Sequence, residues 1–445
     1  MSATIIRNAR IVNEGQIIEG DVLIQNGRIE KIGANIHAVA TEFDAQGHFL
    51  LPGIIDDQVH FREPGLTHKG TIASESRSAV AGGVTTYIEQ PNTKPAATTR
   101  ELLEDKFAIA ARDSYANYSF NMGASNDNIE DLLRADYSTF SGIKVFMGSS
   151  TGNMLVDDLR VLERIFSELP HLIITHCEDE ATIRENLAHY QARYGDDIPM
   201  IYHPEIRSEE ACYLSSSSAV ELAKRHNTRL HIYHISTGAE TALFENTIPL
   251  SEKRITAEAC IHHLWFSDED YAEKGSFIKW NPAVKTALDR EQIWKALLDG
   301  RIDVIATDHA PHTREEKIAP YTSAPSGGPL VQHAVQAMFD FVAQGKISIE
   351  QVVEKMCHNP AILFRIKDRG YIREGYHADL TLVDPASPYT VSSGNILSKC
   401  GWSPFEGHQF KSTIRATWVN GNLVWNGQKV HEQRSAQRLE FLTFG

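Results

Sequence analysis

The sequence has no excess of positive charge, few cysteines and no long hydrophobic run. Its formal net charge is −15, which argues against non-specific nucleic-acid binding, because such binding needs basic patches that displace counterions from phosphates. A small anionic substrate remains compatible with this charge, since a local pocket can hold it. No run of about 18 apolar residues suggests a membrane span, and no N-terminal stretch has the apolar core of a signal peptide.

The cysteines are scattered and odd in number: Cys177, Cys212, Cys260, Cys357 and Cys400. This pattern gives no disulfide framework and fits a reducing compartment, so we expect a cytoplasmic protein. A hydrophobic content of 42% over 445 residues is enough for a large core, in one big domain or two.

Both ends of the chain have the pattern of short strands joined by tight turns. Near the N-terminus, Asn26-Gly27 separates two alternating apolar runs, as in a β-hairpin. Near the C-terminus, residues 378–383 are strand-like, and a second Asn-Gly pair lies at Asn420-Gly421. Two β-rich ends around a different middle predict that the termini pair into one small sheet domain.

The middle of the chain alternates strand-like apolar runs with helical stretches. The expected strands are Ile54–His60, Thr85–Gln90, Tyr118–Gly123, Gly142–Phe146, His171–His176, Leu230–His234, Ile255–Cys260 and Asp303–Asp308. The clearest helical stretches are Arg100–Arg112, Asp158–Leu169, Glu209–His226 and Arg290–Leu298. Strands alternating with helices predict a parallel sheet, and eight repeats over about 250 residues predict a closed barrel. An open doubly wound sheet is the alternative, but no Gly-rich phosphate loop follows the first strand.

The predicted fold is therefore α/β: a (β/α)8 TIM-type barrel with a small β-sandwich domain formed by both chain ends. We expect the barrel to span residues 53–365, and the small domain to combine residues 1–52 with residues 366–445.

Polar residues lie at or near the carboxyl ends of the predicted barrel strands, where the active site of such a barrel lies. These residues are Gln58, His60, Arg62, Asn92, Lys144, His176, His234, Asp308 and His312. A lone histidine at a strand end is more often a hydrogen-bonded structural residue. The joint placement of these side chains at several strand ends is unlikely to arise by chance and indicates a metal site. Imidazole and carboxylate ligands suit zinc.

Two members of this set need a separate explanation. Gln58 shares a strand face with His60, because side chains alternate along a strand. Two histidines at this spacing would clamp a metal ion, whereas glutamine is a weak neutral ligand. Lys144 as an ammonium group would repel a cation, but burial beside a metal lowers the pKa of a lysine. A neutral amine can react with carbon dioxide to form an anionic carbamate, which is a bridging metal ligand.

The chain resembles the dihydroorotases of the amidohydrolase superfamily. The most specific motifs are Val59–Gly65, Gln90–Thr93 and Ala306–Thr313. The resemblance implies a zinc-dependent hydrolase that opens the cyclic amide of dihydroorotate, or closes N-carbamoyl-aspartate, in pyrimidine biosynthesis. It also implies the ligands of one or two zinc ions: His60, Lys144 as a carbamate, His176, His234 and Asp308, with Gln58 contributing weakly or not at all.

The resemblance further implies how the substrate is held. Arg62, Asn92 and His312 would hold its carboxylate, as an arginine fork suits a carboxylate. The ring would contact Asn281, Ser326 and Gly327. Asp308 would be the catalytic residue, which takes a proton from the attacking water and delivers it to the leaving ring nitrogen. The alternative for Arg62 is a salt bridge at the rim with Glu63 or another neighbour.

Two other functions remain open. A hydantoinase, dihydropyrimidinase or allantoinase would share the barrel and the lysine carbamate, and the carboxylate clamp favours dihydroorotate over their uncharged rings. A catalytically impaired subunit that supports a partner enzyme would explain Gln58, but it has no need of the retained ligands. We expect a small anionic substrate and neither nucleic acid nor membrane as a partner. A homo-oligomer is compatible with the resemblance.

The segment 148–153, rich in glycine and hydroxyl groups, is a candidate lid or an exposed loop.

Overall fold

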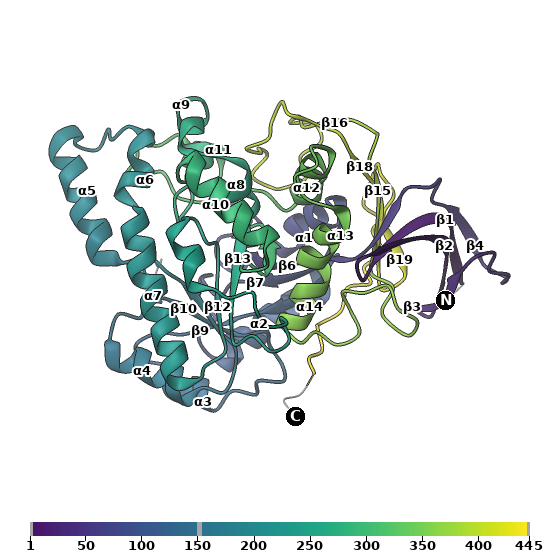
Figure 1. Cartoon of the computed structure of the whole chain (residues 1–445), viewed down its shortest axis with the longest axis horizontal. Coiled ribbons are helices and arrows are strands. Elements are labelled where there is room, and N and C mark those ends of the chain that lie inside the picture. The colour runs from purple at the N-terminus through teal and green to yellow at the C-terminus, as the bar shows by residue number, and fades with distance from the viewer. Residues whose placement is uncertain (1–2, 149–153, 443–445) are drawn as a thin grey trace.

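Eight strand positions in the middle of the chain form a closed parallel barrel (Figure 1). The computed structural model describes residues 3–148 and 154–442, so the candidate lid at 148–153 lies outside the described residues except for Gly148. The barrel strands are β6 (Ile54–Val59), β7 (Val84–Glu89), β8 (Asn117–Phe120) with β9 (Met122–Gly123), β10 (Ile143–Phe146), β11 (Ile173–His176), β12 (Leu230–Ile232), β13 (Ile255–Cys260) and β14 (Val304–Ala306). A parallel bridge between Val59 and His309 closes the barrel. The predicted TIM-type barrel is confirmed.

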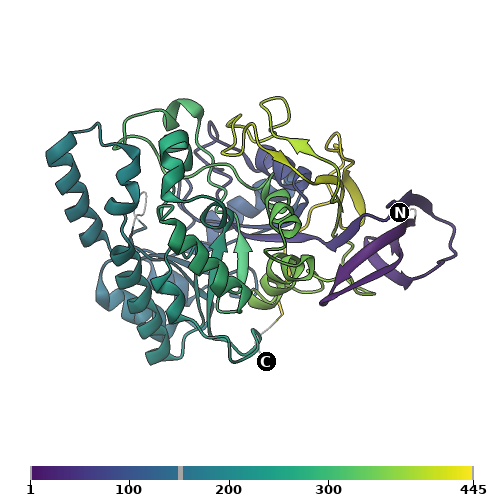
Figure 2. The ribbon, with the colours of Figure 1, turned by 45° about the horizontal axis from the view of Figure 1, so that its top comes forward.

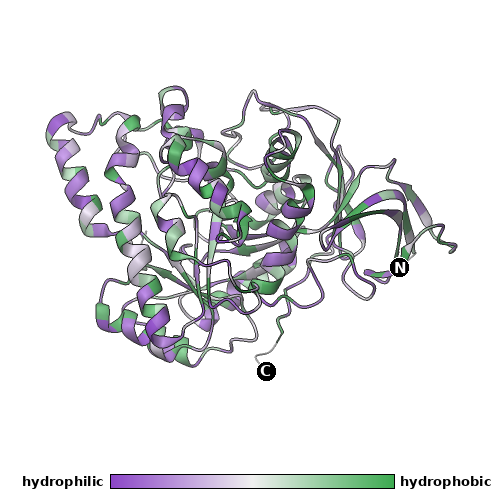
Figure 3. Ribbon diagram, in the orientation of Figure 1, coloured by the Kyte–Doolittle hydropathy of each residue, from purple (hydrophilic) through white to green (hydrophobic). Residues whose placement is uncertain are grey.

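The described helices lie outside the barrel strands, and several show hydrophilic and hydrophobic faces in Figure 3. Their bounds are α1 (Ile72–Ala81), α2 (Arg100–Asp113), α3 (Ile129–Leu133), α4 (Leu159–Glu168), α5 (Glu180–Tyr194), α6 (His203–Ile206), α7 (Glu209–His226), α8 (Ile261–Trp265), α9 (Tyr271–Lys274), α10 (Ala287–Leu298), α11 (Arg314–Lys317), α12 (Ala334–Ala343), α13 (Ile349–Val353) and α14 (Asn359–Leu363). None of these helices is long and apolar enough to cross a membrane.

Local sequence explains where the predicted helices begin. The side chains of Thr99, Asp158 and Ser208 each accept a hydrogen bond from a backbone N–H in the first turn of α2, α4 and α7. Such caps satisfy donors that have no partner within the helix. The observed helices therefore start within one residue of the predicted starts in these three cases, whereas α10 begins at Ala287, three residues before the predicted Arg290.

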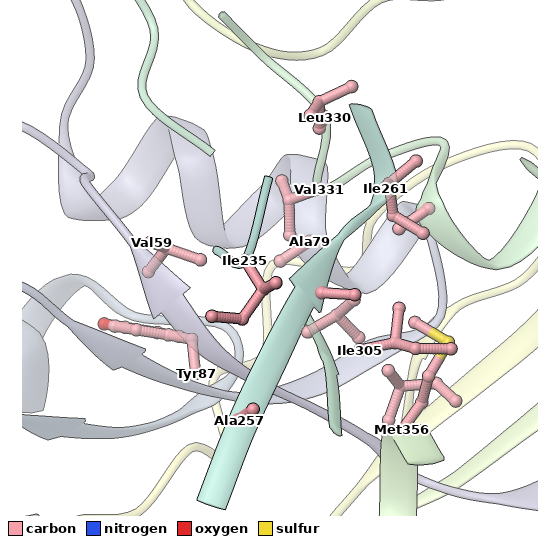
Figure 4. Close-up of a cluster of buried hydrophobic side chains, with 14 of the residues drawn as sticks. Val59, Ala79, Tyr87, Ile235, Ala257, Ile261, Ile305, Leu330, Val331 and Met356 are labelled. Atoms are coloured by element: carbon pink, nitrogen blue, oxygen red, sulfur yellow. The ribbon is translucent and has the colours of Figure 1, made fainter. Parts of the chain in front are cut away.

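The core lies between the barrel strands and the surrounding helices. Val59, Tyr87, Ala257 and Ile305 come from four different barrel strands or strand ends and pack with Ile235 in one buried cluster (Figure 4). Parallel strands that are covered on both faces have continuous apolar sequences. This burial is why the barrel strands could be recognised from the sequence.

Both chain ends contribute to a second, mainly antiparallel sheet, which lies beside the barrel (Figure 2). Its strands are β1 (Thr4–Asn13), β2 (Gln16–Gln25), β3 (Arg28–Gly33), β4 (Thr41–Asp44), β5 (Phe49–Pro52), β15 (Leu380–Asp384), β18 (Thr413–Val419) and β19 (Asn422–Trp425). Strand β5 joins the two ends, because it pairs with β1 on one side and with β15 on the other. A short ribbon of β16 (Tyr389–Thr390) and β17 (Gln409–Phe410) lies apart from this sheet. The sheet-rich unit is confirmed, while the domain boundaries remain a prediction.

The two Asn-Gly pairs form the turns that the sequence predicts. Asn26 and Gly27 have φ angles of 52° and 80°, and Asn420 and Gly421 have φ angles of 48° and 76°. Two consecutive positive φ angles are required by the type I′ turn of a two-residue hairpin, and asparagine followed by glycine adopts them most readily.

Candidate active site

A pocket of about 190 Å³ lies at the carboxyl ends of the barrel strands. It is lined by all of the predicted site residues: Gln58, His60, Arg62, Asn92, Lys144, His176, His234, Asn281, Asp308, His312, Ser326 and Gly327. Phe146, Trp280, Ala310 and Pro325 complete the wall. This volume is below the roughly 300–1,000 Å³ of pockets for drug-sized ligands, which suits a single small ring.

His60 and Asp308 form the first pair of candidate metal ligands. His60 Nδ1 lies 2.8 Å from Asn92 Oδ1, and an amide oxygen only accepts, so Nδ1 carries the proton. The lone pair of His60 Nε2 then faces Asp308 Oδ1 at 3.1 Å. Two acceptors that face each other in a buried site leave room for a cation between them. Asn92 therefore orients His60 in the way that supporting side chains orient metal ligands.

His176 and His234 form the second pair. His176 Nε2 donates to Glu178 Oε2 at 2.9 Å, and Arg207 Nη1 donates to the same oxygen at 2.6 Å. His176 Nδ1 and His234 Nε2 lie 2.9 Å apart. Burial lowers the pKa of His60 and His176, and lowers that of His234 well below its usual value. The three imidazoles are therefore neutral near pH 7, as metal binding requires.

Lys144 has the environment of a neutral amine. Its side chain is 1% exposed, and Nζ has no hydrogen-bond partner among the described residues. It lies 4.0 Å from the centre of the Tyr233 ring and 5.0 Å from that of Phe146. Burial lowers the pKa of Lys144 to about 7, so a large fraction of the amine is unprotonated and able to react with carbon dioxide.

Arg62 and His312 lie side by side in the pocket lining. Arg62 Nη2 lies 2.9 Å from His312 Nε2, and Lys69 Nζ donates to His312 Nδ1 at 2.9 Å. Because Nδ1 accepts, Nε2 carries the proton of the neutral ring, and it donates to Ser326 O. Arg62 Nη2 therefore faces another N–H and lacks an acceptor there. Glu63, the alternative partner of Arg62, instead accepts from the backbone N–H of Ile72.

Three site residues have unusual backbone angles. The φ angles are 71° for Arg62, 41° for His234 and 47° for Asp308. The left-handed region costs a non-glycine residue about 1 kcal/mol or more, and such residues are concentrated at functional sites. Here each residue follows a barrel strand, and the local turn directs its side chain into the pocket.

The part of the pocket lining that would contact a substrate ring contains Asn281, whose amide oxygen is unpaired within the described chain, and Gly327, whose backbone lies close to Ala310. Asn281 Oδ1 has no hydrogen-bond partner among the described residues. Gly327 has a φ of 122°, and a Cβ atom there would lie 2.6 Å from Ala310 O. The Gly327 N–H already donates to Lys279 O at 2.8 Å. Gly327 therefore contributes space, whereas Asn281 offers a polar contact.

The sequence did not reveal two groups of residues near the pocket. Glu178 and Arg207 support His176. Of these two, only Glu178 had a signal in the sequence, because it comes shortly after the predicted strand. Asp57, His231 and Glu258 are fully buried and close enough together to hold a metal ion. They lie within strands rather than at strand ends, where hydrophobic residues are the usual expectation.

The comparisons with known proteins agree with this geometry. The pattern of the Amidohydrolase family matches residues 49–424. A dihydroorotase of Halobacterium salinarum is 36% identical over 423 residues, which cover 92% of this chain and 96% of that protein. A dihydroorotase of Methanosarcina acetivorans is 33% identical, with coverage of 98% and 94%. The chain belongs to the dihydroorotase branch of the amidohydrolase family.

Solved structures of this amidohydrolase fold carry other names. An L-hydantoinase (dihydropyrimidinase) of Arthrobacter aurescens matches with a TM-score of 0.93 at 27% identity, over 99% of this chain and 100% of that one. A dihydropyrimidinase of Brevibacillus agri matches with a TM-score of 0.89 at 24% identity, again over 99% and 100%. These likenesses confirm the fold, while the sequence relatives favour dihydroorotase over the hydantoinase alternative.

Proposed function

We propose that this amidohydrolase is a zinc-dependent dihydroorotase that interconverts dihydroorotate and N-carbamoyl-aspartate. The observation that carries the proposal is Arg62, a buried guanidinium that forms no ion pair with a described carboxylate and faces the pocket that holds the candidate metal ligands. A buried cation without an anionic partner is costly, and the carboxylate of dihydroorotate would supply that partner. The sequence relatives that are named dihydroorotase support the same substrate.

The donor set fits zinc. His60 and Asp308, with Gln58 beside them, would hold one ion, and His176 and His234 would hold another. Lys144, as a carbamate, would bridge the two positions. Neutral imidazoles, a carboxylate and an unpartnered amine are groups that suit such a site. Zinc, when bound, activates water and polarises the scissile carbonyl.

The residues of the chain position the substrate. Arg62 Nη2 presents a charged donor for one oxygen of a carboxylate, and the N–H of His312 beside it would move from Ser326 O to the other oxygen. Asn92 uses its amide oxygen on His60, so its NH2 group remains for the substrate. Asn281 would bond the ring amide, and Gly327 would leave room for the ring plane.

Asp308 would move the proton. Its carboxylate takes a proton from the attacking water, holds it while the tetrahedral carbon forms, and delivers it to the ring nitrogen as the C–N bond breaks. One carboxylate serves both steps because the same proton is taken up and released. In the reverse direction Asp308 removes the proton from the attacking nitrogen.

Purified protein should hydrolyse dihydroorotate and close N-carbamoyl-aspartate, and it should lose both activities when a chelator removes its metal. The assay follows the absorbance of the dihydroorotate ring, with metal content measured on the same sample. Restored activity on adding zinc is the control for damage by the chelator. Bound zinc without turnover of this substrate would contradict the proposal, and hydantoin rings would then be tested.

Replacing Arg62 by alanine should raise the KM for dihydroorotate about 10–100-fold, since a hydrogen bond to a charged group contributes about 1.5–3 kcal/mol. The value of kcat should change much less, because the lost contact binds substrate and transition state alike. Arg314→Ala is the matched control, as Arg314 pairs with Glu406 away from the pocket. An unchanged KM in Arg62→Ala would remove Arg62 from the clamp.

Replacing Gln58 by histidine should raise the zinc content of the purified protein, because an imidazole would complete the position beside His60 and Asp308. The measurement is zinc per chain after dialysis against metal-free buffer. Gln58→Leu, which offers no ligand atom, is the matched control and should not raise the content. Equal zinc content in Gln58→His and the unmodified protein would show that other groups already compensate for the missing histidine.

A further inference from the structure

A second group of metal-ligating side chains lies inside the barrel, below the pocket. Asp57 is on β6, His231 on β12 and Glu258 on β13, and each side chain is fully buried. One ligand atom from each lies within 4.8 Å of the other two. Asp57 and His231 precede the pocket residues Gln58 and His234 in the sequence, and Glu258 bonds the backbone of His234, so the group borders the candidate active site from inside the barrel.

The polar atoms of this group lack partners. Among the described residues, no hydrogen bond reaches either carboxylate oxygen of Asp57, the Oε2 atom of Glu258 or the Nε2 atom of His231. A buried carboxylate without a donor is costly, and native proteins rarely leave several such atoms together. A cation that binds all three side chains would satisfy these atoms together.

The hydrogen bonds of His231 show which nitrogen is free. Thr256 donates its hydroxyl proton to Leu230 O at 3.2 Å, so it accepts from His231 Nδ1 at 2.8 Å. The lone pair of His231 Nε2 then faces Asp57 Oδ2 at 3.4 Å. Two ligands that are each about 2.0–2.1 Å from a tetrahedral zinc ion are roughly 3.4 Å apart. A histidine held by its other nitrogen is also the usual arrangement of a metal ligand.

We propose that Asp57, His231 and Glu258 bind a divalent transition-metal ion, in addition to any ion in the pocket. Two carboxylates balance the charge of one divalent cation. The imidazole excludes a typical calcium or magnesium site, because those ions prefer oxygen ligands. Zinc is therefore the appropriate probe, and the site does not depend on the reaction proposed above.

The ion would stiffen the floor of the pocket. Glu258 Oε1 accepts from the backbone N–H of His234 at 2.9 Å and lies 3.1 Å from Cys260 Sγ. The same sulfur lies 3.5 Å from Gln58 Oε1. An ion on the other oxygen of Glu258 would fix this carboxylate, and with it the backbone of His234. It would also place positive charge behind the position where Gln58 replaces a stronger ligand.

Anomalous diffraction on crystals of the unmodified protein, collected on both sides of the zinc absorption edge, tests the site directly. The protein would be grown with zinc in the medium and crystallised without added metal. We expect an anomalous peak surrounded by Asp57, His231 and Glu258, separate from any peak in the pocket. A map without this peak would overturn the proposal and leave a shared proton between the carboxylates. A peak that requires millimolar zinc in a soak would overturn it equally.

Metal content gives a second measurement. His231→Gln and Glu258→Gln should each lower the zinc content by one ion per chain. His333→Gln is the matched control: His333 is also a buried histidine, but it contacts the hydroxyl of Ser403 rather than a carboxylate. Its zinc content should equal that of the unmodified protein. Unchanged zinc content in folded His231→Gln would overturn the proposal. If the variants do not fold, the anomalous map of the unmodified protein alone shows whether the site binds zinc.

Discussion

Asp308→Asn should reduce the turnover of dihydroorotate by about 10²–10⁴-fold, the usual contribution of a general acid–base group. The amide cannot take the proton from the attacking water, although it keeps an oxygen near His60. The measurements are kcat in both directions and the melting temperature. We expect a melting temperature close to that of the unmodified protein, because the substitution preserves the size of the side chain.

Two comparisons make this result specific to proton transfer. Asp308→Glu keeps the carboxylate and should retain more activity than Asp308→Asn, even though its longer side chain shifts the group. Zinc content should fall little in Asp308→Asn, since the other ligands remain. Turnover by Asp308→Asn at the rate of the unmodified protein would exclude Asp308 as the proton carrier.

Lys144→Ala should reduce turnover by roughly 10³-fold or more, the factor that corresponds to several kcal/mol of lost charge stabilisation. The alanine variant has no amine to form a carbamate, so the ligand between the His60 and His176 pairs is missing. The measurements are kcat and zinc content. A short carboxylic acid such as propionate would supply the missing carboxylate and should restore part of the activity of Lys144→Ala.

Lys144→Arg distinguishes the carbamate from a simple positive charge. An arginine is a permanent cation and forms no carbamate with carbon dioxide, so we expect it to be as inactive as the alanine variant and not to respond to propionate. Full activity in Lys144→Arg would contradict the assignment of Lys144 as a ligand, because it would show that a cation is sufficient at this position.

The barrel could be predicted because its strands carry their own signal. Runs such as Ile54–Val59 and Ile255–Cys260 are buried on both faces, and the alternation with helices such as Glu209–His226 indicates parallel strands. Strand lengths were less accurate: the predicted strand that ends at His234 stops at Ile232. Its last residues turn into the pocket instead, and the positive φ of His234 has no signature in the sequence.

The pocket residues at strand ends could be predicted because a barrel places all strand ends on one face, whatever the details of packing. Asn281, Ser326 and Gly327 lie in loops, and only the family resemblance pointed to them. The hydrogen-bond partners of the pocket residues could not be predicted. Asn92 decides which nitrogen of His60 carries the proton. Lys69 and Ser326 fix the orientation of His312, and this orientation leaves Arg62 Nη2 without an acceptor there. These contacts join residues far apart in the sequence and depend on side-chain conformations that only the folded chain defines. The buried group around Asp57 was missed for the same reason.

The sheet shared by both chain ends has a consequence for how the protein is made. On the ribosome, β5 emerges early, but its antiparallel partner β15 follows only about 330 residues later. The early strands β1, β2 and β3 can pair among themselves. Until β15 is made, one edge of β5 has unpaired backbone groups that can pair with the wrong strand. The barrel is synthesised between the two halves of this sheet. Nascent chains should therefore depend on chaperones until the last strands appear, and truncation at either end should damage the same sheet.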